Sequence, residues 1–361
     1  MAVVLSILAD AGRERDEAGR PISTRSAYPP STFVVLSPLS ALSWNSARLA
    51  WLATLIALFA LHVVALLRLC DLRPLDTKGL ALIGAVLALA PYHTGITLGQ
   101  LSIASIELTI VAVAFVDRNL RTCAALTLAL ALSIKPQLAA PFAIHFFIRQ
   151  QRKVAILAVG ISGLILAAAA GWLWWNRLSW ITPLRENIAA EFGRTIDPAG
   201  PLSVQMIDLR PLLVAVIPTP NAGVIGSAFV FVAATALYWR NRHLADELWL
   251  LSWISVLTLL FGYHRFYDAA LLCLPLGWAI HHASEHATNR WPAAGVIACT
   301  SVFLLPGAVM LDRVSQSREF FWNAIILRHQ IWALLALLTF LFVARPARQA
   351  VVSTADCSKA Q

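Results

Sequence analysis

The chain has 361 residues, of which 59% are hydrophobic and only 13% are charged. Soluble globular proteins carry about 25% charged residues, so this composition excludes an ordinary soluble domain and predicts a polytopic, all-α membrane protein. The net charge of +9 comes from basic residues scattered through inter-helix loops, which favours membrane topology and contact with lipid headgroups over nucleic-acid binding.

The first 45 residues are predicted to form an extracytoplasmic segment with an interfacial helix. Residues 3–9 are apolar but too short to span a membrane, and residues 12–25 are polar. Pro29 and Pro30 force an extended entry into the next apolar stretch. We interpret that stretch, Phe33–Ser43, as a short segment at the membrane interface.

Residues 46–348 are predicted to form the transmembrane domain, and residues 349–361 a cytoplasmic tail. Apolar runs indicate roughly ten crossings, with short re-entrant segments among them: Arg48–Leu67, Gly79–Pro91, Leu101–Val116, Ala124–Ile134 with Leu138–Phe147, Val154–Trp175, Ala222–Tyr238, Leu248–Phe261, Ala269–Ile280, Trp291–Met310 and Ile331–Val343. Lys135 separates two short runs that lie between basic loops. This pattern predicts a broken or re-entrant helix pair with Lys135 near its apex.

The stretch Gly262–Asp268 holds an imidazole, a guanidinium, a carboxylate and two phenols between two long apolar runs. Ionisable groups at membrane depth usually face a cavity or pair with one another. The stretch therefore predicts a polar pocket at one membrane surface. The alternative is an ordinary interhelical loop containing an Arg265–Asp268 ion pair.

The polar motifs alternate with short, basic loops along the chain. Basic loops of this kind are typical of the cytoplasmic side, so every unusual polar motif is expected on the extracytoplasmic face. The five cysteines show neither CxxC nor Cys/His ligand spacing, and neither a disulfide framework nor a metal site is predicted.

Four short motifs follow one another in a familiar order: Tyr28-Pro29-Pro30, Leu36-Ser37-Pro38-Leu39, Gly99-Gln100-Leu101 and Ile134-Lys135-Pro136-Gln137. From about Tyr28 to Asp268 the chain resembles glycosyltransferase family 87. Its members are GT-C-type membrane enzymes and include polyprenol-phosphate-mannose-dependent mannosyltransferases.

The resemblance implies a multi-pass, GT-C-like enzyme of the cell (inner) membrane with an extracytoplasmic active site. Such an enzyme moves a mannosyl or other hexosyl group, with inversion, from a polyprenyl-phosphate-linked donor to a lipid or glycan acceptor. No cofactor is implied.

Transfer from such a donor releases a polyprenyl phosphate, whose developing charge calls for cations. Arg265 and Lys135 are the candidates for binding this phosphate, although Lys135 could instead be a snorkelling lysine beside a helix break. His264 is a candidate catalytic residue or an interfacial hydrogen-bond donor. We expect the remaining substrate contacts from Tyr28, Gln100, Tyr267 and Asp268.

The catalytic base is the weakest part of the resemblance. Enzymes of this class are expected to carry an aspartate in the first external loop, after an initial membrane helix. Here that helix is missing, which indicates an N-terminally truncated chain, and only Asp10 and Asp16 occupy the region. Several interpretations remain: the base lies upstream of Met1, one of these aspartates serves, or the protein is catalytically inactive. Asp268 is a further possibility for the base, although a structural pair with Arg265 is the simpler interpretation.

Two further residues bear on the site. Ser102 stands where the family pattern leads us to expect an asparagine shortly after Gly99-Gln100. Glu107 is an intramembrane carboxyl group, which makes it either a functional candidate or a neutral packing group.

Two other functions compete with the transferase. A polyprenyl-lipid transporter or flippase would also need many helices and a polar cavity, but it is expected to show internal repeats. An inactive membrane scaffold would tolerate the loss of the aspartate.

Overall fold

The computed structural model describes residues 28–182, 184–188, 205–217, 219, 222–243, 246–285, 289–314 and 319–344. These residues are folded mainly into helices, and the strand-like pairing found among them is an isolated antiparallel bridge between Met206 and Arg265. The all-α prediction is therefore confirmed for this part of the chain. Asp10, Asp16 and the C-terminal tail lie outside the described residues.

The helices follow one another with mostly short connections. They are α2 (Pro30–Leu36), η1 (Ser37–Ala41), α3 (Trp44–Leu69), α4 (Thr77–Ala88), α5 (Ala90–Thr97), α6 (Leu101–Asp117), α7 (Arg121–Ile134), α8 (Pro136–Ile148), α9 (Arg152–Trp175), α11 (Leu209–Val216), α12 (Ala222–Asn241), α13 (Glu247–Leu260), η3 (Phe266–Leu272), α14 (Cys273–Glu285), α15 (Trp291–Ser301), η4 (Val302–Leu304), α16 (Gly307–Val314), η5 (Trp322–Ile326) and α17 (His329–Val343).

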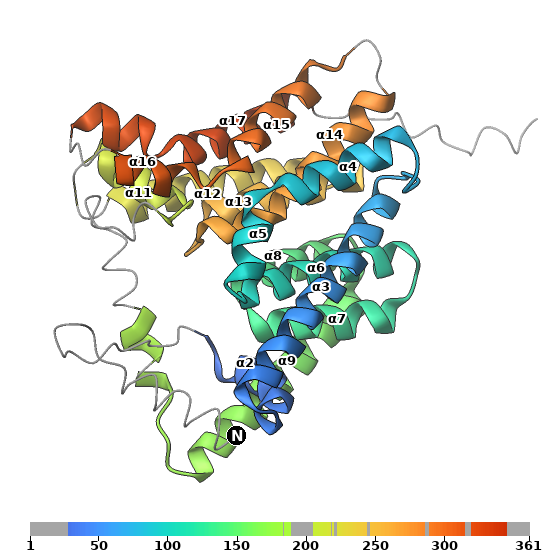
Figure 1. Ribbon diagram of the computed structural model, residues 1–361, viewed down its shortest axis with the longest axis vertical. Coiled ribbons are helices and arrows are strands. Elements are labelled where there is room, and N and C mark those ends of the chain that lie inside the picture. Colours follow the sequence, from blue (N-terminus) through green and yellow to red (C-terminus); the bar gives the residue numbers. More distant parts are fainter. Residues whose placement is uncertain are drawn as a thin grey trace, which may run out of the picture.

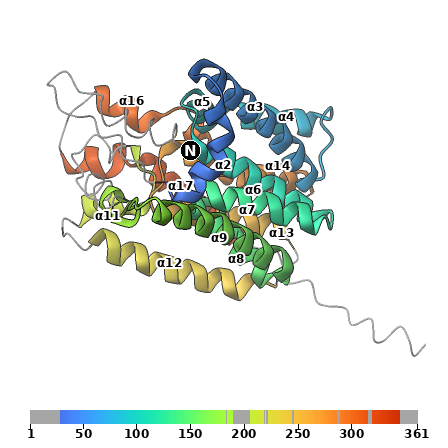
Figure 2. The ribbon, with the colours of Figure 1, turned by 90° about the horizontal axis from the view of Figure 1, so that it is seen from below.

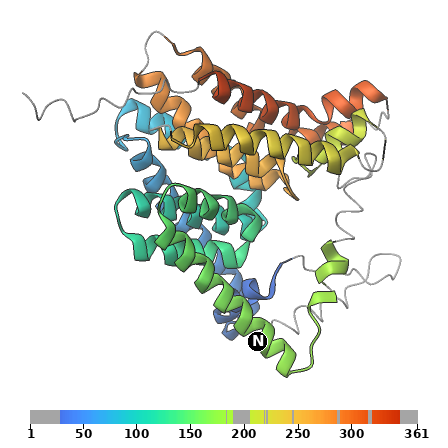
Figure 3. The same ribbon diagram turned by 180° about the vertical axis from the view of Figure 1, so that it is seen from behind.

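The helices form two groups that meet along one seam (Figures 1 and 3). The first group contains α3 and α6 to α9, with α2 packed against α7 and α9; the second contains α12 to α17. Across the seam α8 packs on α13, and both α5 and α6 pack on η3. Figure 2 shows the same arrangement from below, with α12 along one edge of the molecule.

The prediction of roughly ten membrane-spanning helices is not confirmed. By length and composition, three helices in the described part of the chain could cross a membrane: α3, α9 and α12; the bent pair α4–α5 would make a fourth. Several other predicted spans, among them α7, α8, α13 and α17, are shorter apolar helices. Hydropathy alone cannot distinguish a helix buried among other helices from one that faces lipid, because both are apolar.

Two of the predicted boundaries are also wrong. The run expected to end at Pro91 breaks at Leu89, where the chain turns by 52° and continues as α5, so Tyr92 lies within a helix rather than in a loop. The interfacial segment expected from Phe33 begins at Pro30. A proline is well suited to the first turn of a helix, because the N–H that it lacks has no partner there.

The break at Lys135 occurs as the sequence predicts. It is stabilised by side chains of α2, which are distant from it in the sequence. The carbonyl groups at the end of α7 accept hydrogen bonds from α2: the Ser31 hydroxyl donates to Ser133 at 2.9 Å, and the Thr32 hydroxyl donates to Ser133 and Ile134 at 3.1 and 3.0 Å. Both hydroxyl residues are buried. Because the last carbonyl groups of a helix lack partners within it, α2 satisfies groups that the break would otherwise leave unpaired.

We predict that Thr32→Val destabilises the protein by about 1–3 kcal/mol, the usual cost of leaving a buried acceptor, here the Ile134 carbonyl, without a donor. The measurement is the free energy of unfolding of the purified protein in detergent. Thr339→Val is the matched control, because Thr339 is exposed and its hydroxyl bonds only to Leu335 of its own helix. Equal stability of the two variants would show that α2 does not support the break.

Candidate active site

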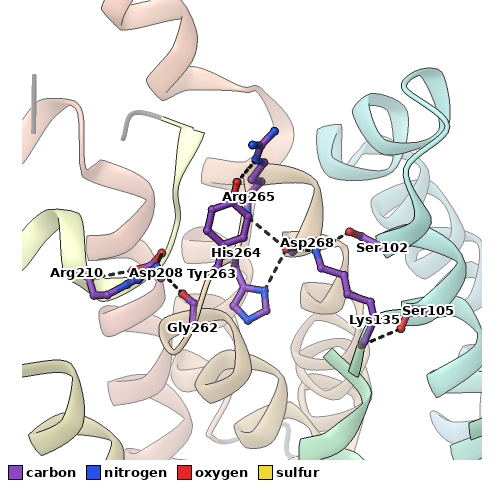
Figure 4. A network of polar contacts seen from close by, with 10 residues as sticks. All are labelled: Ser102, Ser105, Lys135, Asp208, Arg210, Gly262, Tyr263, His264, Arg265 and Asp268. Carbon is purple, nitrogen blue, oxygen red and sulfur yellow. Dashed lines mark hydrogen bonds and ion pairs between the residues drawn. The ribbon is translucent and has the colours of Figure 1, made fainter. Parts of the chain in front are cut away.

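The centre of the site is an ion pair between Lys135 and Asp268, which lie 133 positions apart in the sequence. The Lys135 Nζ atom donates to both carboxylate oxygens of Asp268 at 2.8 Å and to the Ser102 hydroxyl at 2.7 Å. Both charged side chains are buried, with exposed fractions of 5% and 0%. All three ammonium hydrogens therefore have acceptors, and the pair joins α6 and the α7–α8 break to η3 (Figure 4).

Asp268 also accepts two hydrogen bonds from its own loop. His264 Nδ1 lies 3.1 Å from Oδ2, and the backbone N–H of Arg265 donates to the same oxygen at 3.2 Å. Burial by itself would raise the pKa of Asp268, but the Lys135 ammonium and the hydrogen bond from His264 hold that pKa well below its usual range. Asp268 is consequently an anion that links Lys135 to His264 and to the backbone of Arg265. It is a poor proton acceptor.

Three tyrosines surround this ion pair. Tyr28, just before α2, interacts with Ser102 through its hydroxyl; burial raises the pKa of Tyr28 to about 12, so that the phenol stays protonated at neutral pH. The ring of Tyr267 lies 5.5 Å from Lys135 Nζ, measured to the ring centroid. Tyr263 accepts a hydrogen bond from Arg265 Nε at 2.7 Å. The tyrosines provide flat faces and hydroxyl groups beside the charged residues.

Two glycines allow the chain to turn where it enters the site. Gly99 has a φ of +62° and precedes α6, and its carbonyl accepts a hydrogen bond from Trp51 Nε1 at 2.9 Å. Gly262 has a φ of +92° and begins the loop that carries His264, Arg265 and Asp268. Residues with a Cβ rarely adopt such angles, which explains the glycine of the Gly99-Gln100 motif and the start of the loop.

The structure thus brings together Tyr28, Lys135, His264, Tyr267 and Asp268, which the sequence analysis had selected separately. Gln100 lies at the N-terminal end of α6, two residues before Ser102, and its side chain makes no hydrogen bond with the other site residues in the described chain. Lys135 is not a snorkelling lysine, because its ammonium group is buried and bound. Arg265 contributes its backbone N–H to Asp268, whose ionic partner is Lys135 instead.

Sequence reasoning missed the residues that hold the site from outside. Ser31 and Thr32 contact the α7–α8 break, and Arg210, paired with its near neighbour Asp208, contacts Gly262; these contacts join residues that are distant in sequence, so no local signal marks them. Glu107 is fully buried, and neither carboxyl oxygen has a hydrogen-bond partner among the described residues.

A second polar cluster lies at the other end of α8. His145 is bonded to the Tyr238 hydroxyl and to Glu247, and Arg149 donates to Glu247 at 2.9 Å and to the carbonyl of Arg242 at 2.7 Å. These contacts join α8 to α12 and α13. Together with the Lys135–Asp268 pair they connect α8 to the second helix group near both of its ends.

A family model matches residues 27–263, which is well over half of the chain, and its description is glycosyltransferase family 87. The chain belongs to glycosyltransferase family 87. This confirms the resemblance of the four sequence motifs, and it identifies the protein as a membrane glycosyltransferase. Comparison with curated proteins and with solved structures gives no match. The matched region contains Tyr28, Ser102 and Lys135 and ends within the loop just before His264.

We predict that Asp268→Asn destabilises this glycosyltransferase by about 3–5 kcal/mol, because a buried ammonium group is left without its counter-charge. The double variant Lys135→Met with Asp268→Asn should recover part of this loss, since no uncompensated charge remains. Unfolding free energies of the single and double variants measure the coupling. Additive effects of the two substitutions would contradict an energetically coupled pair.

The lowered pKa of Asp268 also predicts how stability depends on pH. A carboxyl group whose pKa is depressed in the folded state stabilises the protein above its unfolded-state pKa of about 3.9, and this contribution is lost as the pH falls below that value. The difference in stability between the native protein and Asp268→Asn should therefore be constant from pH 7 to about 5 and should shrink below about pH 4. Thermal unfolding at a series of pH values measures it; a difference that shrinks already near pH 6 would mean that Asp268 is not held ionised.

Proposed function

We propose that this family 87 enzyme transfers a hexosyl group, mannose in the first instance, from a polyprenyl-phosphate-linked donor to a lipid or glycan acceptor on the extracytoplasmic face. The observation that carries the proposal is the convergence of Tyr28, Ser102, Lys135 and Asp268, next to Arg265. Four segments that are far apart in sequence meet there, at the seam between the two helix groups. Sites between helices of a bundle are a common location for small-molecule binding.

The extracytoplasmic location is supported by the helix ends at which the site residues and the basic turns lie. Tyr28, Gly99-Gln100, Lys135 and the loop after α13 lie at one end of their helices. The turns at the opposite ends contain basic pairs such as Arg118 with Arg121 and Arg149 with Arg152, as is usual on the cytoplasmic side. We place the membrane accordingly, in a GT-C-like arrangement.

Arg265 is the stronger candidate for binding the donor phosphate. A guanidinium group binds two phosphate oxygens at once, and Arg265 is only partly buried at the rim of the site. Lys135 would contact phosphate only by giving up Ser102 or one oxygen of Asp268, because its three hydrogens are already bound. We therefore assign Lys135 mainly to holding Asp268 and the loop Gly262–Asp268, with the ammonium charge compensated by the Asp268 carboxylate.

The reaction is a single displacement at C1 of the sugar. The acceptor oxygen attacks C1 as its proton passes to a base; the bond from C1 to the phosphate oxygen breaks, and its electron pair leaves with polyprenyl phosphate, inverting the configuration. Asp10 and Asp16 stay candidates for the base. Among the described residues the candidate is His264: Nδ1 faces Asp268, and Nε2 has no hydrogen-bond partner there.

We predict that Arg265→Ala lowers kcat/KM for sugar transfer by about 10²–10³, the usual effect of removing one group that stabilises developing charge. Arg265→Lys should keep part of the activity. The assay follows transfer of radiolabelled mannose from polyprenyl phosphate mannose to a membrane lipid extract by purified protein in liposomes. Arg290→Ala, an exposed arginine outside the site, is the control.

The same assay tests the base. His264→Ala should abolish most transfer, and His264→Gln should not restore it, because an amide cannot accept the proton. Undiminished transfer in both Arg265→Ala and His264→Ala would exclude this site. Absence of transfer by the native protein would favour a lipid transporter or an inactive scaffold.

A further inference from the structure

The loop Gly262–Asp268, called here the site loop, is bound by a segment that is distant from it in the sequence. This anchor segment, Met206–Arg210, consists of the three residues before α11 and the first two residues of that helix. The backbone N–H of Ile207 donates to the carbonyl of His264 at 3.1 Å, and Met206 forms an antiparallel bridge with Arg265. The anchor segment therefore pairs, through its backbone, with the two residues proposed to contact the substrates.

An ion pair between Asp208 and Arg210 stabilises the contact between the anchor segment and the site loop (Figure 4). Asp208 is fully buried, and its carboxylate accepts hydrogen bonds from Arg210 Nε at 2.8 Å and from Arg210 Nη2 at 2.9 Å. The same carboxylate caps α11 by accepting the backbone N–H of Arg210 at 3.1 Å. Arg210 also donates to the carbonyl of Gly262 at 3.2 Å. One ion pair thus holds both the start of α11 and the start of the site loop.

The geometry points to Arg210 as a positioning residue: held by Asp208, it fixes Gly262 so that His264 and Arg265 are presented to the donor phosphate and the acceptor. Gly262 needs such support because glycine, which has no Cβ, adopts the positive φ found here but also many other conformations. Buried bidentate arginine–carboxylate pairs are specific in geometry, and lysine cannot reproduce them. Neither Arg210 nor Asp208 is placed to touch substrate in this scheme, which rests on the proposed function.

The experiment combines hydrogen–deuterium exchange with kinetics on the full chain in liposomes. Arg210→Ala should speed exchange in residues 262–268 and lower kcat for mannosyl transfer about tenfold or more. Arg210→Lys should give intermediate values of both. Arg118→Ala, an exposed arginine at the opposite end of the bundle, should change neither.

The double variant distinguishes positioning from general stability. If Arg210 acts in part by placing Arg265, Arg210→Ala should lower kcat by a smaller factor in a protein that already carries Arg265→Ala than in the native protein, because coupled residues are not additive. Fully multiplied effects, or unchanged exchange in residues 262–268, would overturn the inference. Should Arg210→Ala fail to fold, Asp208→Asn replaces it, since asparagine keeps the helix cap and removes the ion pair.

The exchange measurement also separates this inference from the proposed function. If the native protein transfers no mannose, the proposed function fails, and exchange in the site loop alone decides whether the anchor segment holds it. If transfer occurs and Arg210→Ala leaves both kcat and exchange unaltered, the proposed function stands and the positioning role is wrong.

Discussion

The buried ion pair between Lys135 and Asp268 is the interaction on which the other features of the site depend. Removing two charges from water is costly, and their attraction compensates only when the remaining hydrogen-bonding groups are satisfied as well. Ser102, His264 and the backbone of Arg265 supply those groups here. The pair therefore forms only when α6, the α7–α8 break and the site loop are all in place, which makes it a specific marker of the correctly packed bundle.

Helix α8 connects this site to the opposite end of the bundle. Lys135 precedes its first residue and binds η3, whereas His145 and Arg149, near its end, bind Glu247 at the start of α13. Packing between apolar helices in a membrane is weakly directional, and polar contacts set the register. With such contacts near both ends, α8 has little freedom to slide along α13, and the two sides of the site keep a fixed spacing.

The distribution of charge is consistent with the phosphate-linked donor proposed above. Asp268 would repel a phosphate if it were uncompensated, but the ammonium of Lys135 neutralises it at 2.8 Å. Arg265 lies above this pair at the rim, beside the Tyr263 hydroxyl, and the anchor segment holds its backbone from the other side. In the proposed reaction, preorganised charges of this kind would require no rearrangement when negative charge develops on the leaving phosphate.

Several features of the fold and of the candidate site can be predicted from the sequence. Apolar composition determined the helical membrane class, the four motifs determined the family, Lys135-Pro136 marked a helix break, and the site loop was recognisable because five polar side chains stand between apolar runs. These signals are local and follow from periodicity and backbone preference. Tertiary structure alone decided that Asp268 pairs with Lys135, that α2 caps the break, and that Asp208 and Arg210 hold the loop, because such contacts join residues that are distant in sequence. It also decided which apolar helices are long enough to span a membrane, since hydropathy is the same for a helix facing lipid and for one buried among its neighbours.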